Sequence, residues 1–209
     1  MRRFISRGYR YVIAGAALIG IILGTTRGTP AQSVSTQEAT RSVRRALERL
    51  PYYGVFDFMA FGLERGAVTL TGYTYTGSLR TAAESAVRQA SGVDEVANRL
   101  ELLPASPDDD RIRWVTFYRI YTDAFLSRYA SGGPDQVMRE IYEARHFPGM
   151  HQPLGRYAIH IVVMNGRTTL FGMVANDADR QIAEVRAREV SGVFGVENEL
   201  VVTKTVAKK

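Results

Sequence analysis

Hydrophobic residues along the first half of the chain change from helical to strand spacing. Apolar side chains at 39–50 recur every three or four positions, which is the spacing of one helix face, and Ser35 with Glu38 forms a capping box before them. Residues 55–63 and 67–75 are rich in Val, Phe, Thr and Tyr, which favour strands. The pattern predicts a helix from about Ser35, followed by two antiparallel strands.

The segments that follow complete one structural unit. Arg65-Gly66 separates the two strands as a two-residue hairpin turn. An apolar stripe at 79–90 stops at Gly92, which can take the left-handed conformation that a helix end requires. Alternating positions at 96–102 predict a half-buried strand. The unit is therefore α-β-β-α-β.

The same unit occurs twice. Residues 66–102 align without a gap onto residues 166–202, and 14 of the 37 positions are identical. Ordinary composition would give on the order of two or three identities by chance. The identical residues of the first copy, each with a twin one hundred positions later, are Gly66, Thr69, Leu70, Gly72, Arg80, Ala83, Glu84, Arg88, Ser91, Gly92, Val93, Val96, Asn98 and Leu100.

Two ordered motifs in each copy resemble the signature of the BON-domain family. The motif T-L-x-G is Thr69–Gly72 in the first copy and Thr169–Gly172 in the second. The motif S-G-V-x-x-V-x-N-x-L is Ser91–Leu100 and then Ser191–Leu200. The resemblance predicts one domain at 36–103, a linker at 104–108, a second domain at 109–203 and a basic tail at 204–209.

The resemblance also carries expectations about fold and function. It implies an α+β fold in which each repeat packs two helices on one face of a three-stranded sheet. Members of the family, among them an osmotically inducible periplasmic protein, are typically secreted or envelope-associated. They are implicated in binding phospholipid surfaces and in envelope stress tolerance. The family pattern contains no catalytic residues, so the resemblance implies none here.

The shared residues have structural roles in this interpretation. Gly72 and Gly172 lie in mid-strand, where a close approach of the second helix of the repeat would explain a glycine. Asn98 and Asn198 are in phase with inward-facing residues, so their amides must find backbone partners, and we expect each to fix a loop. Gly92 and Gly192, another shared pair, lie at the predicted helix ends.

The N-terminus resembles a secretory signal peptide. Four arginines within the first ten residues precede an apolar run at 12–23, and Thr29-Pro30-Ala31 offers a small-residue cleavage site. A retained inner-membrane anchor is the alternative, but a run of twelve residues would make a helix of only about 18 Å, against ~30 Å of hydrocarbon. We therefore expect residues 1–31 to be removed, a mature chain from about Gln32 and a periplasmic location.

Charge and composition exclude several classes of protein. The chain has 27 basic and 21 acidic residues, and five of the arginines lie in the first 31 positions, where there is no acid. The remaining chain carries about +1, which does not favour a nucleic-acid partner. With no cysteine, disulfides and thiolate metal sites are excluded.

The second copy contains an insertion of about 29 residues, at approximately 131–155. Pro134 and the spacing of the apolar residues after it predict a short helix, and an apolar loop follows that helix. The insertion is either a lid folded onto its own domain or a contact surface for lipid or protein. The residues that would make this contact are Met138, Ile141, Tyr142, Phe147 and Met150.

The hairpin strands are apolar on both faces. In the first copy, Val55, Met59 and Phe61 alternate with Phe56 and Phe58. Helices on one face cannot cover both, so the other face must be shielded by the sister repeat, a second chain or a bilayer, and the sister repeat is the first choice.

Candidate chemistry is sparse. His146 and His151 with Glu143 could be tested as metal ligands, but Pro148 and Gly149 intervene and a solvated surface is the simpler interpretation. Acids at 108–110 suit a helix N-terminus. We find no catalytic, cofactor or metal site. The predicted function is a non-enzymatic envelope protein associated with phospholipid surfaces, and the alternative is an adaptor that binds an envelope protein; the sequence leaves the oligomeric state open.

Overall fold

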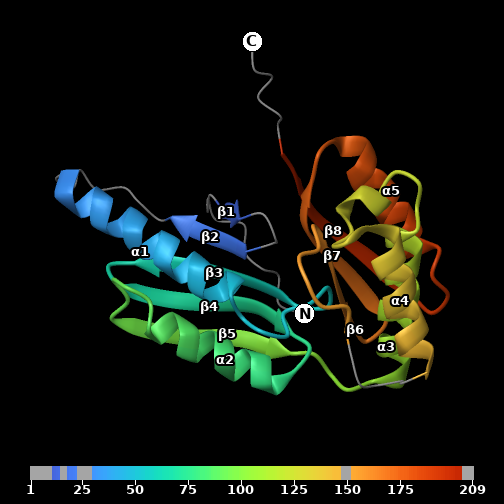
Figure 1. The fold of residues 1–209 in the computed structure, drawn as a ribbon, viewed down its shortest axis with the longest axis horizontal. Helices are drawn as coiled ribbons and strands as arrows, with labels where there is room; N and C mark the ends of the chain where they lie inside the picture. Colours follow the sequence, from blue (N-terminus) through green and yellow to red (C-terminus); the bar gives the residue numbers. More distant parts are fainter. Residues whose placement is uncertain (1–10, 15–17, 23–29, 147–151, 204–209) are drawn as a thin grey trace, which may run out of the picture.

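The computed structural model describes residues 11–14, 18–22, 30–146 and 152–203. Two α-β-β-α-β units follow one another along the chain (Figure 1). The architecture is α+β, as expected from the repeat.

The first repeat contains two helices and three strands of its own. They are α1 (Pro30–Glu48), β3 (Phe58–Glu64), β4 (Ala67–Thr74), α2 (Gly77–Arg88) and β5 (Glu95–Leu102). Strands β3 and β4 are antiparallel, and β5 lies parallel to β4. Arg65 and Gly66 have φ values of 47° and 84°, so the predicted hairpin turn is confirmed.

The second repeat has the same order with an insertion. Its elements are α3 (Pro107–Tyr121), η1 (Ser127–Tyr129), α4 (Gly133–His146), β6 (Ile159–Met164), β7 (Arg167–Val174), α5 (Asp177–Arg188) and β8 (Gly195–Val202). Gly72 pairs with Met59 and Gly172 with Ile159, so the offset of one hundred extends back through β3 and β6. Helices α1 and α3 end 73 positions apart, so the extra stretch is about 27 residues long and contains η1 and α4.

Two more strands from the N-terminal segment extend the first sheet. They are β1 (Tyr11–Ala14) and β2 (Leu18–Ile22), which form a hairpin, and β2 lies parallel to β3. The first sheet therefore has the order β1-β2-β3-β4-β5, whereas the second is β6-β7-β8. No helix within the described residues is both long and apolar enough to cross a bilayer.

The predicted capping box at Ser35 is wrong. Helix α1 already begins at Pro30, so Ser35 and Glu38 lie inside it, and a proline suits the first turn because its missing N–H would have no helical partner there. In the second repeat a side chain does cap the corresponding helix: Ser106 Oγ accepts a hydrogen bond from the N–H of Asp109 at 3.2 Å.

Each helix pair covers one face of its own sheet. In the first repeat, buried residues of α1 and α2 pack on Met59, Phe61, Leu63 and their neighbours. In the second, α3 and α5 pack on Ile159, Ile161 and Val163 of β6. Figure 1 shows α3, α4 and α5 on the side of the second sheet that faces away from the first repeat.

The other faces of the two sheets pack against each other. Phe58 and Ala60 of β3 form a cluster with Leu103 and Val162, and the Phe58 ring stacks on Phe171 of β7 with the ring centroids 4.1 Å apart. The expectation that the sister repeat shields the second strand face is therefore confirmed.

One detail of that expectation is wrong. Val55 does not join Met59 in the first core, because both Val55 and Phe56 belong to the core of the second repeat. The segment before β3 crosses to the sister repeat, where Ile161 N–H donates to Val55 O at 2.8 Å. Gly54 pairs with Leu154, its own repeat counterpart, so equivalent segments of the two copies meet at the junction.

The repeated mid-strand glycine is explained by its own hairpin, not by a helix. Gly72 has φ +120°, and a Cβ atom there would lie 2.1 Å from the carbonyl oxygen of Phe58 on the neighbouring strand. Gly172 has φ +124° and the same relation to Ala158, at 2.0 Å. A side chain is therefore excluded both by the backbone conformation and by adjacent backbone. The predicted close approach exists, but the predicted partner, the second helix, is wrong.

Candidate binding surface

Two buried carboxylates fix the start of the insertion to α5. Asp123 accepts a hydrogen bond from Arg186 Nε at 2.8 Å and two more from backbone N–H groups that follow it. Burial raises the pKa of Asp123, but these hydrogen bonds outweigh it and hold the pKa below its usual value. Asp179, in the first turn of α5, accepts from Tyr129 Oη at 2.5 Å and pairs with Arg128. Helix α4 therefore follows an anchored segment.

Helix α4 presents different residues to the core and to solvent. Val137 is fully buried, and Ile141 packs against the core of the second repeat. Met138 and Tyr142, one turn apart, are 55% and 61% exposed. The Tyr142 ring lies 4.0 Å from the ring of exposed His146. The insertion thus has an inner side that covers the core like a lid, and an outer side on which Met138 and Tyr142 lie among the exposed charged residues Asp135, Arg139 and Glu143.

The structure divides the five predicted contact residues into three groups. Met138 and Tyr142 lie together on the outer side of α4, and Ile141 contributes to packing beneath them. Phe147 and Met150 lie outside the described residues. Of the aromatic residues of α3, Phe117 and Tyr121 are buried in the core, whereas Tyr118 is 45% exposed.

The junction between the repeats contains a buried acid that the sequence did not single out. Asp57 is fully buried and accepts hydrogen bonds from Gly54 N–H at 2.9 Å, Tyr75 N–H at 2.6 Å and Gln152 Nε2 at 2.5 Å. Burial raises the pKa of Asp57 to about 6, although the three donors act in the opposite direction. Gln152 Oε1 also accepts from Phe56 N–H at 3.1 Å, so this amide bonds the end of the insertion to the first repeat.

A buried histidine lies at the same junction. His160 on β6 is fully buried beside the rings of Tyr53 and Phe58, at centroid distances of 5.3 and 6.4 Å. Neither ring nitrogen has a hydrogen-bond partner of good geometry in the structure. Burial lowers the pKa of His160 to about 4, so the ring is neutral at pH 7. Ala60 occupies the equivalent position in the first repeat.

These titratable groups do not form a metal site. Within the part of the chain that the structure describes, no three His, Asp or Glu side chains come close enough to hold an ion. His146 is exposed on α4, His160 is buried in β6, and His151 lies outside the described residues.

The repeated asparagine joins a strand to a helix. Asn98 Nδ2 donates to the Arg80 carbonyl at 3.1 Å and to Glu84 Oε2 at 3.0 Å, while its own oxygen accepts from Leu100 N–H. Asn198 repeats this pattern with Arg180 and Glu184. The predicted backbone partner is present, but it lies in α2 or α5 and not in a loop.

Glutamate and arginine complete this network in both copies. Arg88 donates to Glu84 at 2.6 Å, and Arg188 donates to Glu184 at 2.7 Å. The hydrogen bond from Arg88, with a second from Asn98, lowers the pKa of Glu84. The identity of these residues at both repeat positions was the sequence signal for the network, and it was overlooked.

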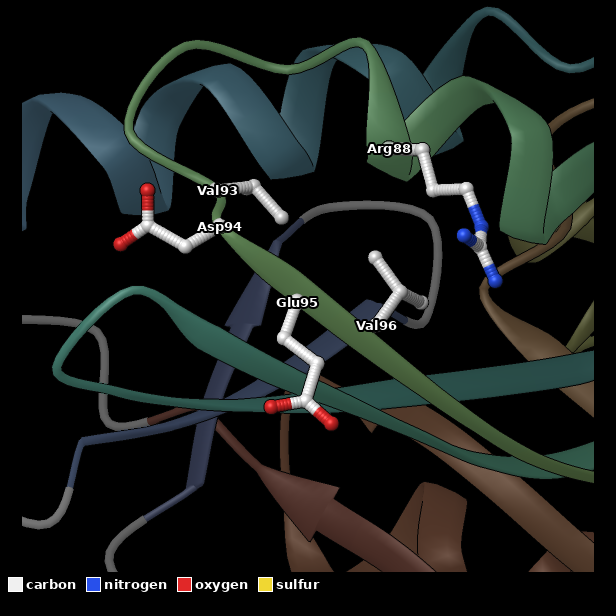
Figure 2. A pocket seen from close by; sticks show the side chains of 5 residues that line it. All are labelled: Arg88, Val93, Asp94, Glu95 and Val96. Carbon is white, nitrogen blue, oxygen red and sulfur yellow. The ribbon is translucent and has the colours of Figure 1, made fainter.

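A shallow hollow of about 430 Å³ lies beside this network in the first repeat, lined by Arg88, Val93, Asp94, Glu95 and Val96. Figure 2 shows Arg88 extending from α2 on one side, while the carboxylates of Asp94 and Glu95 point away from it and from each other. The hollow therefore has no convergent donor set for a bound small molecule.

Known proteins identify the repeated unit. The sequence matches the family described as BON domain over residues 35–104 and again over residues 149–204. The chain belongs to the BON-domain family. The second match begins after α4, so α3 and most of the insertion lie outside it, whereas the β-β-α-β part of that BON repeat is fully included.

Other comparisons add little to this identification. No curated protein matches this chain. Similar solved structures include the C-terminal domain of CdsD, a structural protein of the type III secretion system of Chlamydia trachomatis, at 14% identity and a TM-score of 0.23, covering 78% of this chain and 96% of that one. A second CdsD structure is 14% identical with a TM-score of 0.24, covering 80% and 93%. Likeness at this level carries no argument about function.

Proposed function

We propose that this protein is a secreted, non-enzymatic protein of the cell envelope that associates with phospholipid membrane surfaces. The observation that carries the proposal is the outer side of α4, where Met138 and Tyr142 are 55% and 61% exposed on a helix whose inner side is fixed in the core. Membership of the BON family supports a place in the envelope, and a role in envelope or osmotic stress tolerance is part of the proposal.

Association would be apolar and reversible. Shallow burial of two or three side chains contributes a few kcal/mol, which is enough for weak attachment to a bilayer surface. The region after residue 31 carries a net charge of about +1, so general attraction to anionic lipid is not its main driving force. Phe147 and Met150 follow α4 directly in the sequence and would add to the same contact.

The absence of an enzymatic role is also part of the proposal. Burial shifts the pKa values of two junction side chains, Asp57 and His160, and both side chains are fully buried. A catalytic group must come within hydrogen-bond reach of a substrate, which neither can do in this fold. We propose that both serve the packing of the repeats.

Secretion is compatible with the arrangement of the strands. Removal of residues 1–31 would take away β1 and β2 and leave β3-β4-β5, which is the same three-stranded set as β6-β7-β8 in the second repeat. Ala39, Val43 and Leu47 of α1, which are buried in the first core, all lie beyond the proposed cleavage point. The mature chain would therefore keep both cores.

Vesicle co-sedimentation tests the membrane proposal. The double variant Met138→Ser, Tyr142→Ser should bind phospholipid vesicles severalfold less than the unmodified protein, with unchanged circular dichroism and thermal melting. A matched control, Tyr52→Ser with Leu102→Ser, changes two exposed apolar residues of the first repeat and should bind normally. Deleting the insertion is unsuitable because Val137 is core and Gln152 joins the repeats.

The outcomes separate the two functions considered. Full-strength vesicle binding by the double variant would move the contact away from α4. An unmodified protein that binds no vesicles, neutral or anionic, would refute the membrane proposal and favour a protein adaptor.

A further inference from the structure

The second repeat carries an exposed phenylalanine in the turn between α5 and β8. Phe194 is 81% exposed, more than any other large hydrophobic side chain of the described residues. Its N–H donates to the Gly166 carbonyl at 2.8 Å, and a Cβ atom on Gly166 would lie 2.5 Å from the Phe194 ring. The ring therefore lies over the β6-β7 hairpin turn and remains open to solvent.

Two arginines flank this phenylalanine. Arg111 of α3 donates from Nη2 to the Ser191 carbonyl at 3.1 Å. Arg167 Nη1 lies 3.3 Å from the position that a Cβ atom on Gly195, the residue after Phe194, would occupy. Both arginines are exposed, and neither forms an ion pair within the described part of the chain. We call residues 165–167 and 191–195 with Arg111 the Phe194 tip.

Hydrogen bonds to a buried aspartate hold the Phe194 tip in place. Asp109, which is 2% exposed, accepts hydrogen bonds from the N–H groups of Asn165 and Gly166 at 2.9 and 2.8 Å. The hairpin turn is thereby attached to the first turn of α3. A side chain on a backbone turn that is already held in place loses little conformational freedom when it becomes buried in a contact.

The equivalent end of the first repeat has the opposite character. Asp94 and Glu95 stand where the second repeat has Phe194 and Gly195, and Ala67 stands in place of Arg167. Gly92 lies against Ala39, whereas its twin Gly192 lies against Arg111. The first end therefore combines two acids with Arg65, the counterpart of Asn165, whereas the second end is aromatic and basic.

We infer that the Phe194 tip is a membrane contact that inserts the Phe194 ring into a bilayer containing anionic phospholipid, with Arg111 and Arg167 on the lipid phosphates. The inference rests on the proposed membrane association and adds a second, charge-dependent site to the contact at α4. A protruding ring with exposed arginines beside the residues before and after it suits the boundary of headgroups and acyl chains.

The size of the tip favours lipid over protein. Asp109 is buried and its carboxylate accepts hydrogen bonds from the hairpin, whereas Asp108 on α3 and both Glu197 and Glu199 on β8 are exposed. A specific protein interface needs about 1,000 Å² or more of complementary surface, whereas shallow insertion needs only one anchored ring and its flanking charges.

The test uses vesicles of phosphatidylcholine alone and vesicles that also contain phosphatidylglycerol. Phe194→Asp should lower the partition coefficient of the protein into the anionic vesicles about tenfold, because burial of a phenylalanine ring is lost. Arg111→Glu with Arg167→Glu should lower it severalfold and remove most of its salt dependence. The control Tyr52→Asp changes a 70% exposed aromatic of the first repeat and should bind as the unmodified protein does.

A fluorescence variant keeps the inference testable if Phe194→Asp fails to fold. Phe194→Trp should show a blue-shifted emission on adding anionic vesicles, whereas Tyr52→Trp should not. If the unmodified protein binds vesicles but Phe194→Asp binds equally well, or if the emission of the Phe194→Trp variant does not move, the inference is refuted and the proposed function stands. If the unmodified protein binds no vesicles at all, the proposed function fails first.

Discussion

Replacing His160 by leucine should make the protein more stable in mild acid than the unmodified chain. The ring is fully buried beside Tyr53 and Phe58, and burial lowers its pKa from 6.5 to about 4. The unfolded chain exposes this ring and lets it protonate near pH 6.5. A depressed folded pKa means that the stability contribution of neutral His160 is fully present above pH 6.5 and is lost as the pH falls toward 4.

The size of the effect follows from the two pKa values. The folded and unfolded pKa values of His160 differ by about 2.5 units, which corresponds to a loss of about 3 kcal/mol of stability once the ring is protonated in both states. Most of this loss, about 2.5 kcal/mol, has occurred by pH 4.5. Asp57 acts in the opposite sense, because its raised pKa favours the fold below about pH 4 and this contribution disappears as the pH rises through 6. In the unmodified protein the two titrations therefore offset each other, and we expect the free energy of unfolding to change less with pH than either group alone would cause.

Comparison of the two proteins isolates the histidine, since both contain Asp57. The free energy of unfolding of each protein is measured with urea at pH 4.5 and pH 7.5. The value for His160→Leu minus the value for the unmodified protein should be larger at pH 4.5 than at pH 7.5, by about 2 to 3 kcal/mol. A difference for His160→Leu that is the same at both pH values would refute the assignment of a buried neutral ring.

Three further outcomes can be measured directly. Gly172→Val should destabilise its repeat by about 2 kcal/mol or more, because φ is +124° and backbone lies 2.0 Å from the new Cβ, while Gly77→Ala, which meets nothing within 4 Å, should be near neutral in thermal melting. Asn198→Ala should cost about 1 to 2 kcal/mol in urea unfolding, since the β8 to α5 hydrogen bonds are lost. Intact-mass measurement of the protein from the envelope fraction should give a chain that begins near Gln32, and a full-length mass would instead support a retained anchor.

The repeat made most of the fold predictable. An offset of one hundred placed the hairpin, the second helix and the last strand of both copies, and the asparagine twins were expected to have backbone partners before any geometry was known. Local spacing reports which residues share a face, because the helix and strand periods are fixed by backbone geometry.

Contacts across the junction could not be read in this way. The alternation that assigns Met59 and Phe61 to one face applies only while the chain remains in one sheet, and β3 begins at Phe58. Val55 and Phe56 precede it and enter the other core through pairing with residues around 153–161, about one hundred positions away. The close approach at Gly72 was anticipated, but periodicity does not identify which neighbour makes it.

Asp57 and Gln152 were missed for a related reason. Each is an isolated polar residue in its own segment, and only the meeting of the two repeats brings the amide within 2.5 Å of the carboxylate. Neither position is shared between the copies, because Tyr157 and Tyr52 occupy the equivalent places. Internal identity reveals what both copies need to fold, so it cannot reveal a contact that is made once.

Positions at which the two copies differ are therefore the better candidates for function. Glu84, Arg88 and Asn98 recur because each repeat needs the same bond between its second helix and its last strand. Phe194 against Asp94 cannot be explained in that way, since both make the same backbone hydrogen bond to the hairpin glycine, Gly166 or Gly66, at 2.8 Å. The backbone tolerates either side chain there, so the fold does not require the exposed aromatic, and the proposed membrane contact gives it a role.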